Sequence, residues 1–253
     1  MTDTFEFEVC ANGLQSALNA SKAGATRVEL CAGMPEGGTT PSYGTVFSAY
    51  ANLKETNTKL HVIIRPRGGD FRYDGCDACC MFADFKLLYQ YVDGFVFGGL
   101  KEDGSIDTDI LKPFIASSAG KSMTFHRAFD MCSDPLKAID QLAEMGFSRI
   151  LTSGGCATAE EGIHHLREWQ RHAEGKITLM AGGGINEHNI RRIYEETGIT
   201  AFHFSAREQF PSRMTYRNER AFMGKAGADE FSIEYSTEEK VRRIISALQA
   251  GCN

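Results

Sequence analysis

Apolar residues recur along the chain in eight runs of strand length, separated by longer segments with helical spacing. The runs are 5–10, 27–32, 60–66, 94–100, 122–128, 149–154, 177–184 and 201–206. The segments between them are 14–23, 43–55, 78–92, 108–118, 135–145, 159–173 and 187–197. These segments carry apolar residues three to four positions apart, which is the pattern of helices that bury one face. Strands and helices are therefore expected to alternate along the chain.

Eight such units in 253 residues predict a (β/α)8 TIM barrel, an α/β fold of about 250 residues that commonly forms one domain. A closing helix, 238–249, completes the set. An open doubly wound sheet is the alternative, because it also alternates strands and helices. No linker rich in proline or serine interrupts the chain, so residues 1–253 are predicted to be a single domain.

The phase of the first two strands places charged residues inside the barrel. Side chains alternate along a strand, so Glu8 and Cys10 face the interior when Phe7 faces the helices. The second strand repeats this arrangement with Glu29 and Cys31. Barrel interiors are usually filled by Val, Ile and Leu, so this interior is expected to be unusually polar.

Buried charges need partners, because an unpaired buried charge is costly. We expect Glu8 and Glu29 to face Arg65 or Arg67, which follow the third strand. One interpretation is a salt-bridge layer that only fills the barrel. The other is a functional site, because barrel enzymes place their chemistry at the carboxyl ends of the strands.

The fifth strand ends in a cluster of ionisable side chains. His126 lies on the face opposite Phe125 and Arg127, and Asp130 follows closely. Histidine can exchange a proton near neutral pH, so His126 and Asp130 join the two glutamates as candidates for acid and base catalysis. A satisfied core histidine is the alternative for His126.

Residues in three loops are candidates for an anion-binding site. Its candidate residues are Arg65, Arg67, Asp70, Gly183, Gly184 and Ser205. The arginines match carboxylate and phosphate geometry, although anchoring of their own loop by the aspartate is the alternative. The glycines and the serine follow strands seven and eight, where many barrels bind phosphate with backbone N–H groups at a helix N-terminus.

Composition narrows the classes of function. A formal net charge of -6 gives no basic surface for nucleic acid or an anionic membrane. The N-terminus has no signal-peptide pattern, and no apolar run approaches the roughly 18 residues of a membrane span. Eight cysteines are too few for a disulfide scaffold, which favours a cytoplasmic protein. Because the charge gives no basic surface, a small molecule or an ion is the expected partner.

Residues 207–233, between the eighth strand and the closing helix, are polar and aromatic. A segment of this length without regular structure is usually functional or forms an interface. We expect either a lid over the site or a contact within a homo-oligomer, most simply a dimer.

Seven short motifs resemble the CutC family, in an ordered match from about residue 5 to residue 250. They are EVC at 8–10, VELC at 28–31, GGTTPS at 37–42, IRPRGGDF at 64–71, TFHRAFD at 124–130, LTSGG at 151–155 and AGGG at 181–184. The resemblance implies a TIM barrel, a cytoplasmic location and a role in copper homeostasis. It implies no particular substrate or reaction.

The resemblance makes Cys10 and Cys31 candidate Cu(I) ligands, because soft thiolates select Cu(I). Adjacent strands lie about 4.7 to 4.9 Å apart, which brings two sulfurs within reach of one metal. Two observations oppose this: barrel stagger offsets inward residues of adjacent strands, and most free cysteines are small buried apolar groups. Cys76, Cys79 and Cys80, at the start of a predicted helix, lie outside the family pattern and are interpreted as incidental.

Two hypotheses follow. The first is a cytoplasmic, copper-handling protein that holds Cu(I) through its inward-facing cysteines. The second is an enzyme of unknown reaction that acts on a small anionic or phosphorylated metabolite. No motif for an organic cofactor is evident in the sequence.

Overall fold

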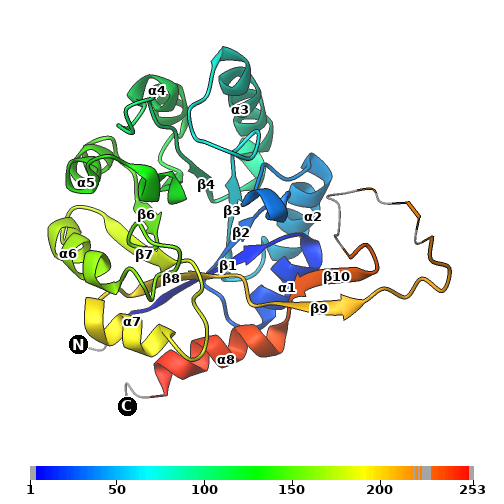
Figure 1. The fold of residues 1–253 in the computed structure, drawn as a ribbon. Helices are drawn as coiled ribbons and strands as arrows, with labels where there is room; N and C mark the ends of the chain where they lie inside the picture. The colour runs from blue at the N-terminus through cyan, green and yellow to red at the C-terminus, as the bar shows by residue number, and fades with distance from the viewer. Residues whose placement is uncertain (1–3, 219, 222, 224–228, 251–253) are drawn as a thin grey trace.

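The eight apolar runs form eight short parallel strands. They are β1 (Glu6–Ala11), β2 (Arg27–Leu30), β3 (Lys59–Ile63), β4 (Gly94–Phe97), β5 (Ser122–Phe125), β6 (Arg149–Thr152), β7 (Thr178–Gly182) and β8 (Ala201–Phe204). In the computed structural model they pair in chain order, and β8 pairs with β1 to close the ring (Figure 1). The structure describes residues 4–250 except 219, 222 and 224–228. The predicted TIM barrel is confirmed.

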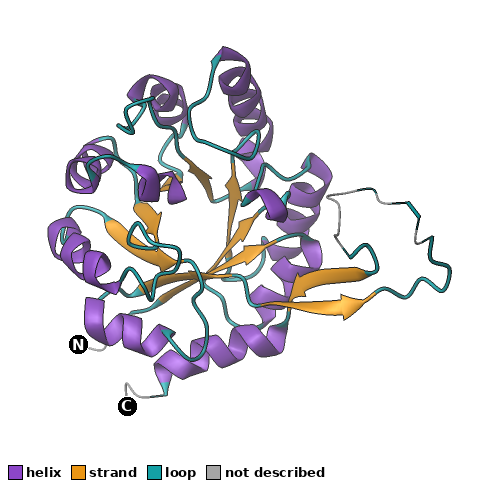
Figure 2. Ribbon diagram, viewed as in Figure 1, coloured by secondary structure: helices purple, strands orange, loops and turns teal. Residues whose placement is uncertain are grey.

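Helices alternate with the strands and surround the ring (Figure 2). They are α1 (Leu14–Lys22), α2 (Tyr43–Leu53), α3 (Gly75–Leu88), α4 (Thr108–Ser117), α5 (Pro135–Glu144), α6 (Ile163–Ala173), α7 (Ile190–Thr197) and α8 (Glu238–Gln249). Side-chain oxygens accept first-turn N–H groups at the amino ends of α2, α3, α4, α5 and α8. The caps are Ser42, Asp74, Asp107, Asp134 and Thr237.

The barrel has two kinds of interior. Between strands and helices lies an apolar core, in which the buried Phe85 packs against the rings of Phe95 and Phe114. Inside the ring, charged residues such as Glu8 and Arg27 are buried as well. The polar barrel interior expected from the strand phases is therefore present, and it positions the site described below.

The segment after β8 is not the structureless loop that the sequence suggested. It begins with β9 (Arg207–Pro211) and ends with β10 (Ser232–Ser236), which pair antiparallel and project from the barrel wall beside α1 (Figure 1). Asn12 and Asn19 donate side-chain N–H groups to the backbone of β10, at 2.6 and 2.9 Å. Residues 219, 222 and 224–228 of this segment lie outside the described part, and its role as a lid or an interface stays a prediction.

Among the residues that the structure describes, no helix combines the length and the apolar character needed to cross a membrane.

Candidate functional site

The carboxyl ends of the strands enclose a cavity of about 340 Å³. Its lining residues are Cys10, Glu29, Cys31, Glu36, Gly37, Ile63, Arg65, Phe71, His126, Arg127, Leu151 and His203. A cavity of this size is at the small end of the range that holds small-molecule ligands. The structure thus brings together five of the predicted site residues, which are Cys10, Glu29, Cys31, Arg65 and His126.

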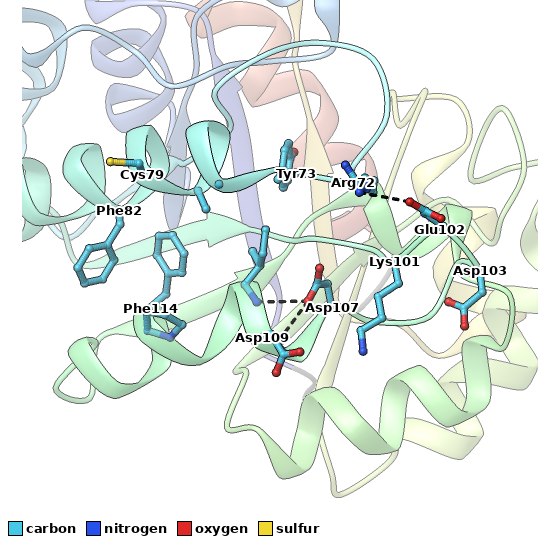
Figure 3. Close-up of a pocket in the computed structure, with 14 residues that line it drawn as sticks. Arg72, Tyr73, Cys79, Phe82, Lys101, Glu102, Asp103, Asp107, Asp109 and Phe114 are labelled. Atoms are coloured by element: carbon cyan, nitrogen blue, oxygen red, sulfur yellow. Dashed lines mark hydrogen bonds and ion pairs between the residues drawn. The ribbon is translucent and has the colours of Figure 1, made fainter.

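A larger hollow of about 980 Å³ lies on the flank of the barrel (Figure 3). Phe82 of α3 and Phe114 of α4 form part of its wall, together with Cys79. Cys79 and its neighbours Cys76 and Cys80 are exposed on α3, and none of the three lines the barrel cavity. The residues predicted to be catalytic, anion-binding or metal-binding do not line this hollow, so we place the candidate site at the barrel mouth.

Cys10 and Cys31 lie side by side in the cavity. The register of β1 on β2 pairs Cys10 with Glu29, so Cys31 comes two residues further along, where its backbone N–H bonds to Ala11 O at 2.9 Å. The two Sγ atoms are 3.9 Å apart, and both side chains are buried. The stagger of the barrel therefore does not separate the two sulfurs.

The two thiols titrate as a pair. Hydrogen bonding from Cys31 and from His203 lowers the pKa of Cys10 well below its usual value, although burial acts in the opposite direction. The same contact with Cys10, together with burial, raises the pKa of Cys31 well above its usual value. The pair therefore loses its first proton readily and retains the second.

Both carboxylate oxygens of Glu8 have a positively charged partner. Arg27 Nε donates to its Oε2, and His203 Nδ1 lies 2.8 Å from its Oε1. Burial alone would raise the pKa of Glu8, but positive Arg27 and the bond to His203 lower it below its usual value. The predicted pairing with Arg65 or Arg67 is wrong, because the strand register places Glu8 beside Arg27 on β2 and His203 on β8.

Glu29 has much weaker partners than Glu8, and it does not pair with the predicted arginines either. Its Oε2 lies 3.7 Å from Nε2 of His203. Burial raises the pKa of Glu29 to about 8, so its carboxyl is protonated at neutral pH. Burial would lower the pKa of His203, but its bonds to Cys10 and Glu8 raise that pKa well above its usual value, so the imidazole is cationic.

Arg65 is buried and held by backbone oxygens. Its Nη1 donates to Glu36 O at 2.7 Å and to Gly38 O at 2.8 Å, and its Nη2 donates to Gly69 O at 3.0 Å. The guanidinium carbon lies 5.0 Å from the centre of the Phe71 ring. Its Nε is buried and has no partner among the described residues.

His126 follows β5, and its ring lies over Gly98, just beyond the end of β4. A Cβ at Gly98 would lie 2.8 Å from the imidazole, so the ring occupies space that a side chain would take. His126 Nδ1 accepts the N–H of Ala128 at 3.2 Å. Burial and the nearby positive Arg65 lower the pKa of His126 to about 3, which keeps the ring neutral. Its Nε2 is buried and unpartnered within the described chain.

Arg127 and Asp130 belong to the 3-10 helix η3 (Arg127–Met131), which follows β5. In this helix the side chains no longer alternate between two faces as they do along a strand. Arg127 therefore lines the cavity, and its predicted placement on the face opposite His126 is wrong. Asp130 accepts from Arg127 Nε at 2.7 Å, from Thr152 Oγ1 at 2.5 Å and from Ser153 N at 3.1 Å. These bonds fix the loop after β6. Asp130 does not line the cavity, and its catalytic role stays a prediction.

Arg67 and Asp70, both predicted to bind an anion, do not line the cavity. Arg67 donates to Asp77 Oδ2 at 3.0 Å and to Asp70 Oδ1 at 3.1 Å. Its side chain also bonds to backbone oxygens of the same loop. These contacts fit the alternative interpretation, in which the pair anchors its own loop.

The predicted phosphate loops have a different geometry from the expected one. Gly183 and Gly184 adopt φ values of 99° and 76°, and a Cβ at Gly183 would lie 3.5 Å from Arg127 Nη1. Ser205 leads into β9 rather than into a helix, and α7 begins only at Ile190. The expected helix N-terminus directly after these strands is therefore wrong, while phosphate binding by these residues stays a prediction.

Comparison with known proteins adds the family. The family model described as the CutC family matches residues 5–208. The chain belongs to the CutC family. It is 51% identical to a family protein CutC of Bacteroides thetaiotaomicron, over 97% of this chain and 99% of the relative. It is 42% identical to the human copper homeostasis protein cutC homolog, over 95% of this chain and 88% of that protein.

A solved structure agrees with the fold of this CutC family member. The crystal structure of a CutC protein from Streptococcus agalactiae matches with a TM-score of 0.76 and 36% identity, covering 80% of this chain and 99% of that chain. The family match ends within β9, so β10 and α8 lie beyond it. All five predicted residues that meet in the cavity lie inside the matched range.

Proposed function

We propose that this CutC family protein binds Cu(I) through the thiolates of Cys10 and Cys31, within a role in copper homeostasis. The human relative carries that role in its name. The observation that carries the proposal is the 3.9 Å approach of two buried sulfurs. Two sulfurs that are each about 2.3 Å from one metal ion lie at most about 4.6 Å apart, so these two can share an ion.

The chemistry of the donors suits Cu(I). Thiolates are soft ligands, and the pair loses one proton readily. A Cu(I) ion bound by two thiolates carries a net negative charge, and the cationic imidazole of His203 offsets that charge. A carboxylate oxygen of Glu29 lies within 4.8 Å of both sulfurs and could add a third donor after losing its proton.

A competitive titration with a colorimetric Cu(I) chelator under reducing conditions tests the proposal. The double variant Cys10→Ser, Cys31→Ser removes both sulfurs from the cavity. The triple variant Cys76→Ser, Cys79→Ser, Cys80→Ser is the matched control, because it removes three exposed thiols from α3. Circular dichroism on both variants verifies that the barrel remains folded.

We expect the parent and the triple variant to bind one Cu(I) with equal affinity. The double variant should bind at least about 100-fold more weakly, which corresponds to about 2.8 kcal/mol. Equal affinity in the parent and the double variant would remove this site, and a loss confined to the triple variant would assign copper to α3.

A second function, an enzyme acting on a small anionic metabolite, is favoured by a different feature of the cavity. Glu29, with a pKa of about 8, and the neutral His126 both line it. A general acid works best when its pKa lies near the operating pH. Glu8 is unsuited to this role, because both of its oxygens are bonded and its pKa is lowered.

Thermal denaturation with a panel of small carboxylates and phosphate esters tests this second function. A ligand at 100 times its Kd adds about 2.7 kcal/mol of stability. A stabilising compound would then be followed for turnover by the parent and by Glu29→Gln, which should retain binding and lose turnover. A panel in which no anionic compound raises the Tm would contradict the enzyme function.

A further inference from the structure

One part of the cavity wall presents two buried N–H donors that have no acceptor among the described residues. They are Nε of Arg65 and Nε2 of His126, and each residue is 4% exposed. Both residues line the cavity, and the Phe71 ring packs against both, 5.0 Å from the guanidinium carbon and 5.0 Å from the imidazole centre. The two donors therefore belong to one local surface.

The hydrogen bonds define what this surface can bind. His126 Nδ1 accepts a backbone N–H, so the single proton of the neutral ring lies on Nε2, which is a donor. The other two guanidinium nitrogens of Arg65 donate to three backbone oxygens, so Nε is the one nitrogen of this side chain without a partner in the described chain. Two donors without an acceptor call for a ligand that brings oxygen acceptors.

The charge around the two donors is also unbalanced. Within the described chain, Arg65 makes no ion pair within 4.0 Å, whereas Arg127, another guanidinium that lines the cavity, is paired with Asp130 at 2.7 Å. Two carboxyl groups line the cavity as well. Glu36 accepts the N–H of Gly68 at 3.1 Å, and within the described chain neither Glu36 nor Glu29 forms an ion pair with Arg65 within 4.0 Å. The surface thus favours a ligand with negative charge.

We propose that Arg65 and His126 form a binding site for an oxyanion, the carboxylate or phosphate group of a small molecule that occupies the barrel mouth. Buried donors in folded proteins are nearly always paired, and two unpaired donors on one cavity wall are what such a ligand would satisfy. The site shares the cavity with the two thiols but uses different residues. It therefore stands whether or not Cys10 and Cys31 hold copper.

Isothermal titration of the reduced, metal-free protein tests the site. The probes are acetate, pyruvate, inorganic phosphate and glycerol phosphate, with glycerol as the uncharged control. His126→Asn removes the Nε2 donor while leaving a side chain that can still cap η3. Arg72→Gln is the matched control, because Arg72 lies on the same loop as Phe71 but is exposed and pairs with Glu102 at 3.2 Å outside the cavity.

We expect one probe class, carboxylate or phosphate, to bind one to one, at least about tenfold more weakly to His126→Asn and equally well to Arg72→Gln. Binding should also persist in the double variant Cys10→Ser, Cys31→Ser, which separates this site from the copper site. Absence of binding by every charged probe, equal binding to His126→Asn, or an equal loss in Arg72→Gln would overturn the proposal.

Side-chain ¹⁵N NMR of the parent keeps the test independent of the variants. The His126 Nε2–H resonance should shift during titration with the bound probe and stay unchanged with glycerol. An unchanged resonance at saturation would place the ligand elsewhere and overturn the assignment even if His126→Asn fails to fold.

Discussion

Glu8 and Glu29 are both buried inside the barrel on neighbouring strands, yet their surroundings differ. Glu8 bonds to Arg27 and His203, and its pKa is lowered. Glu29 lies one layer closer to the mouth, its nearest cation is 3.7 Å away, and burial raises its pKa to about 8. The same residue type is thus an ion-paired carboxylate in one layer and a neutral carboxylic acid in the next.

The contrast extends to the two layers of inward-facing side chains, a lower layer around Glu8 and an upper layer around Glu29 at the barrel mouth. In the lower layer Arg27 bonds to Glu6 as well as to Glu8, and Arg149 reaches Glu6 at 3.5 Å and Ser122 at 2.8 Å. In the upper layer Arg65 Nε and His126 Nε2 have no partner in the part of the chain that the structure describes. The ion pairs of the lower layer indicate a structural role, although Arg149 Nε there also lacks a partner among the described residues. Unpaired groups that line a cavity indicate a site.

The largest effect is expected from breaking the lower layer. Arg27→Met removes the main partner of Glu8 and leaves a buried carboxylate beside His203 alone. We expect a loss of about 3 to 5 kcal/mol in the free energy of unfolding, measured by urea denaturation. The exposed Arg72→Met is the control and should change stability by less than about 1 kcal/mol. A comparably small loss for Arg27→Met would show that the lower layer is not structural.

A smaller effect is expected at Asp130, which holds a loop at the edge of the site. Asp130→Asn weakens its bonds to Arg127, Thr152 and Ser153, so we expect a loss of about 1 to 3 kcal/mol in urea denaturation. Affinity for Cu(I) in the chelator competition should stay the same. Unchanged stability together with lost Cu(I) or oxyanion binding would instead assign Asp130 to the functional site.

The effect expected at Glu29 near neutral pH has the opposite sign from the effects at Arg27 and Asp130. The folded pKa of about 8 exceeds the unfolded value of about 4.3, so the folded protein retains a proton that the unfolded chain releases between these values. The stability contribution of this proton is complete below about pH 4 and is lost as the pH rises through about 8.

Glu29→Gln removes this dependence. Urea denaturation at several values between about pH 5 and about pH 8 should show the variant gaining stability relative to the parent as the pH rises. Glu8 has the opposite dependence, because its lowered pKa makes its contribution complete above the unfolded value and lost at acid pH. A loss above about 3 kcal/mol for Glu29→Gln across this range would assign Glu29 to the structural layer.

The alternation of strands and helices could be predicted from periodicity alone, because each strand and helix carries its own apolar pattern. The two-residue period also predicted correctly that Glu8, Cys10, Glu29 and Cys31 face inward. The sequence motifs gave the family as well, which the family model confirms. These are all properties of single segments or of their order.

Partners of the inward residues could not be predicted, because strand register depends on contacts between segments far apart in sequence. Register places Arg27 and His203 level with Glu8, so these two residues and not Arg65 or Arg67 are its partners. The role of Gly98, whose missing side chain leaves room for His126, also has no signal in the pattern of either strand alone. The direction of the Arg67 side chain could not be predicted either, because a residue in a loop belongs to no periodic pattern.

Copper-edge anomalous diffraction from crystals prepared with Cu(I) under reducing conditions tests the central claim most directly. If the upper layer is the functional site, the anomalous peak lies between the Sγ atoms of Cys10 and Cys31. A peak at Cys76, Cys79 and Cys80 on α3, or no peak in the barrel mouth at full Cu(I) loading, would contradict the account.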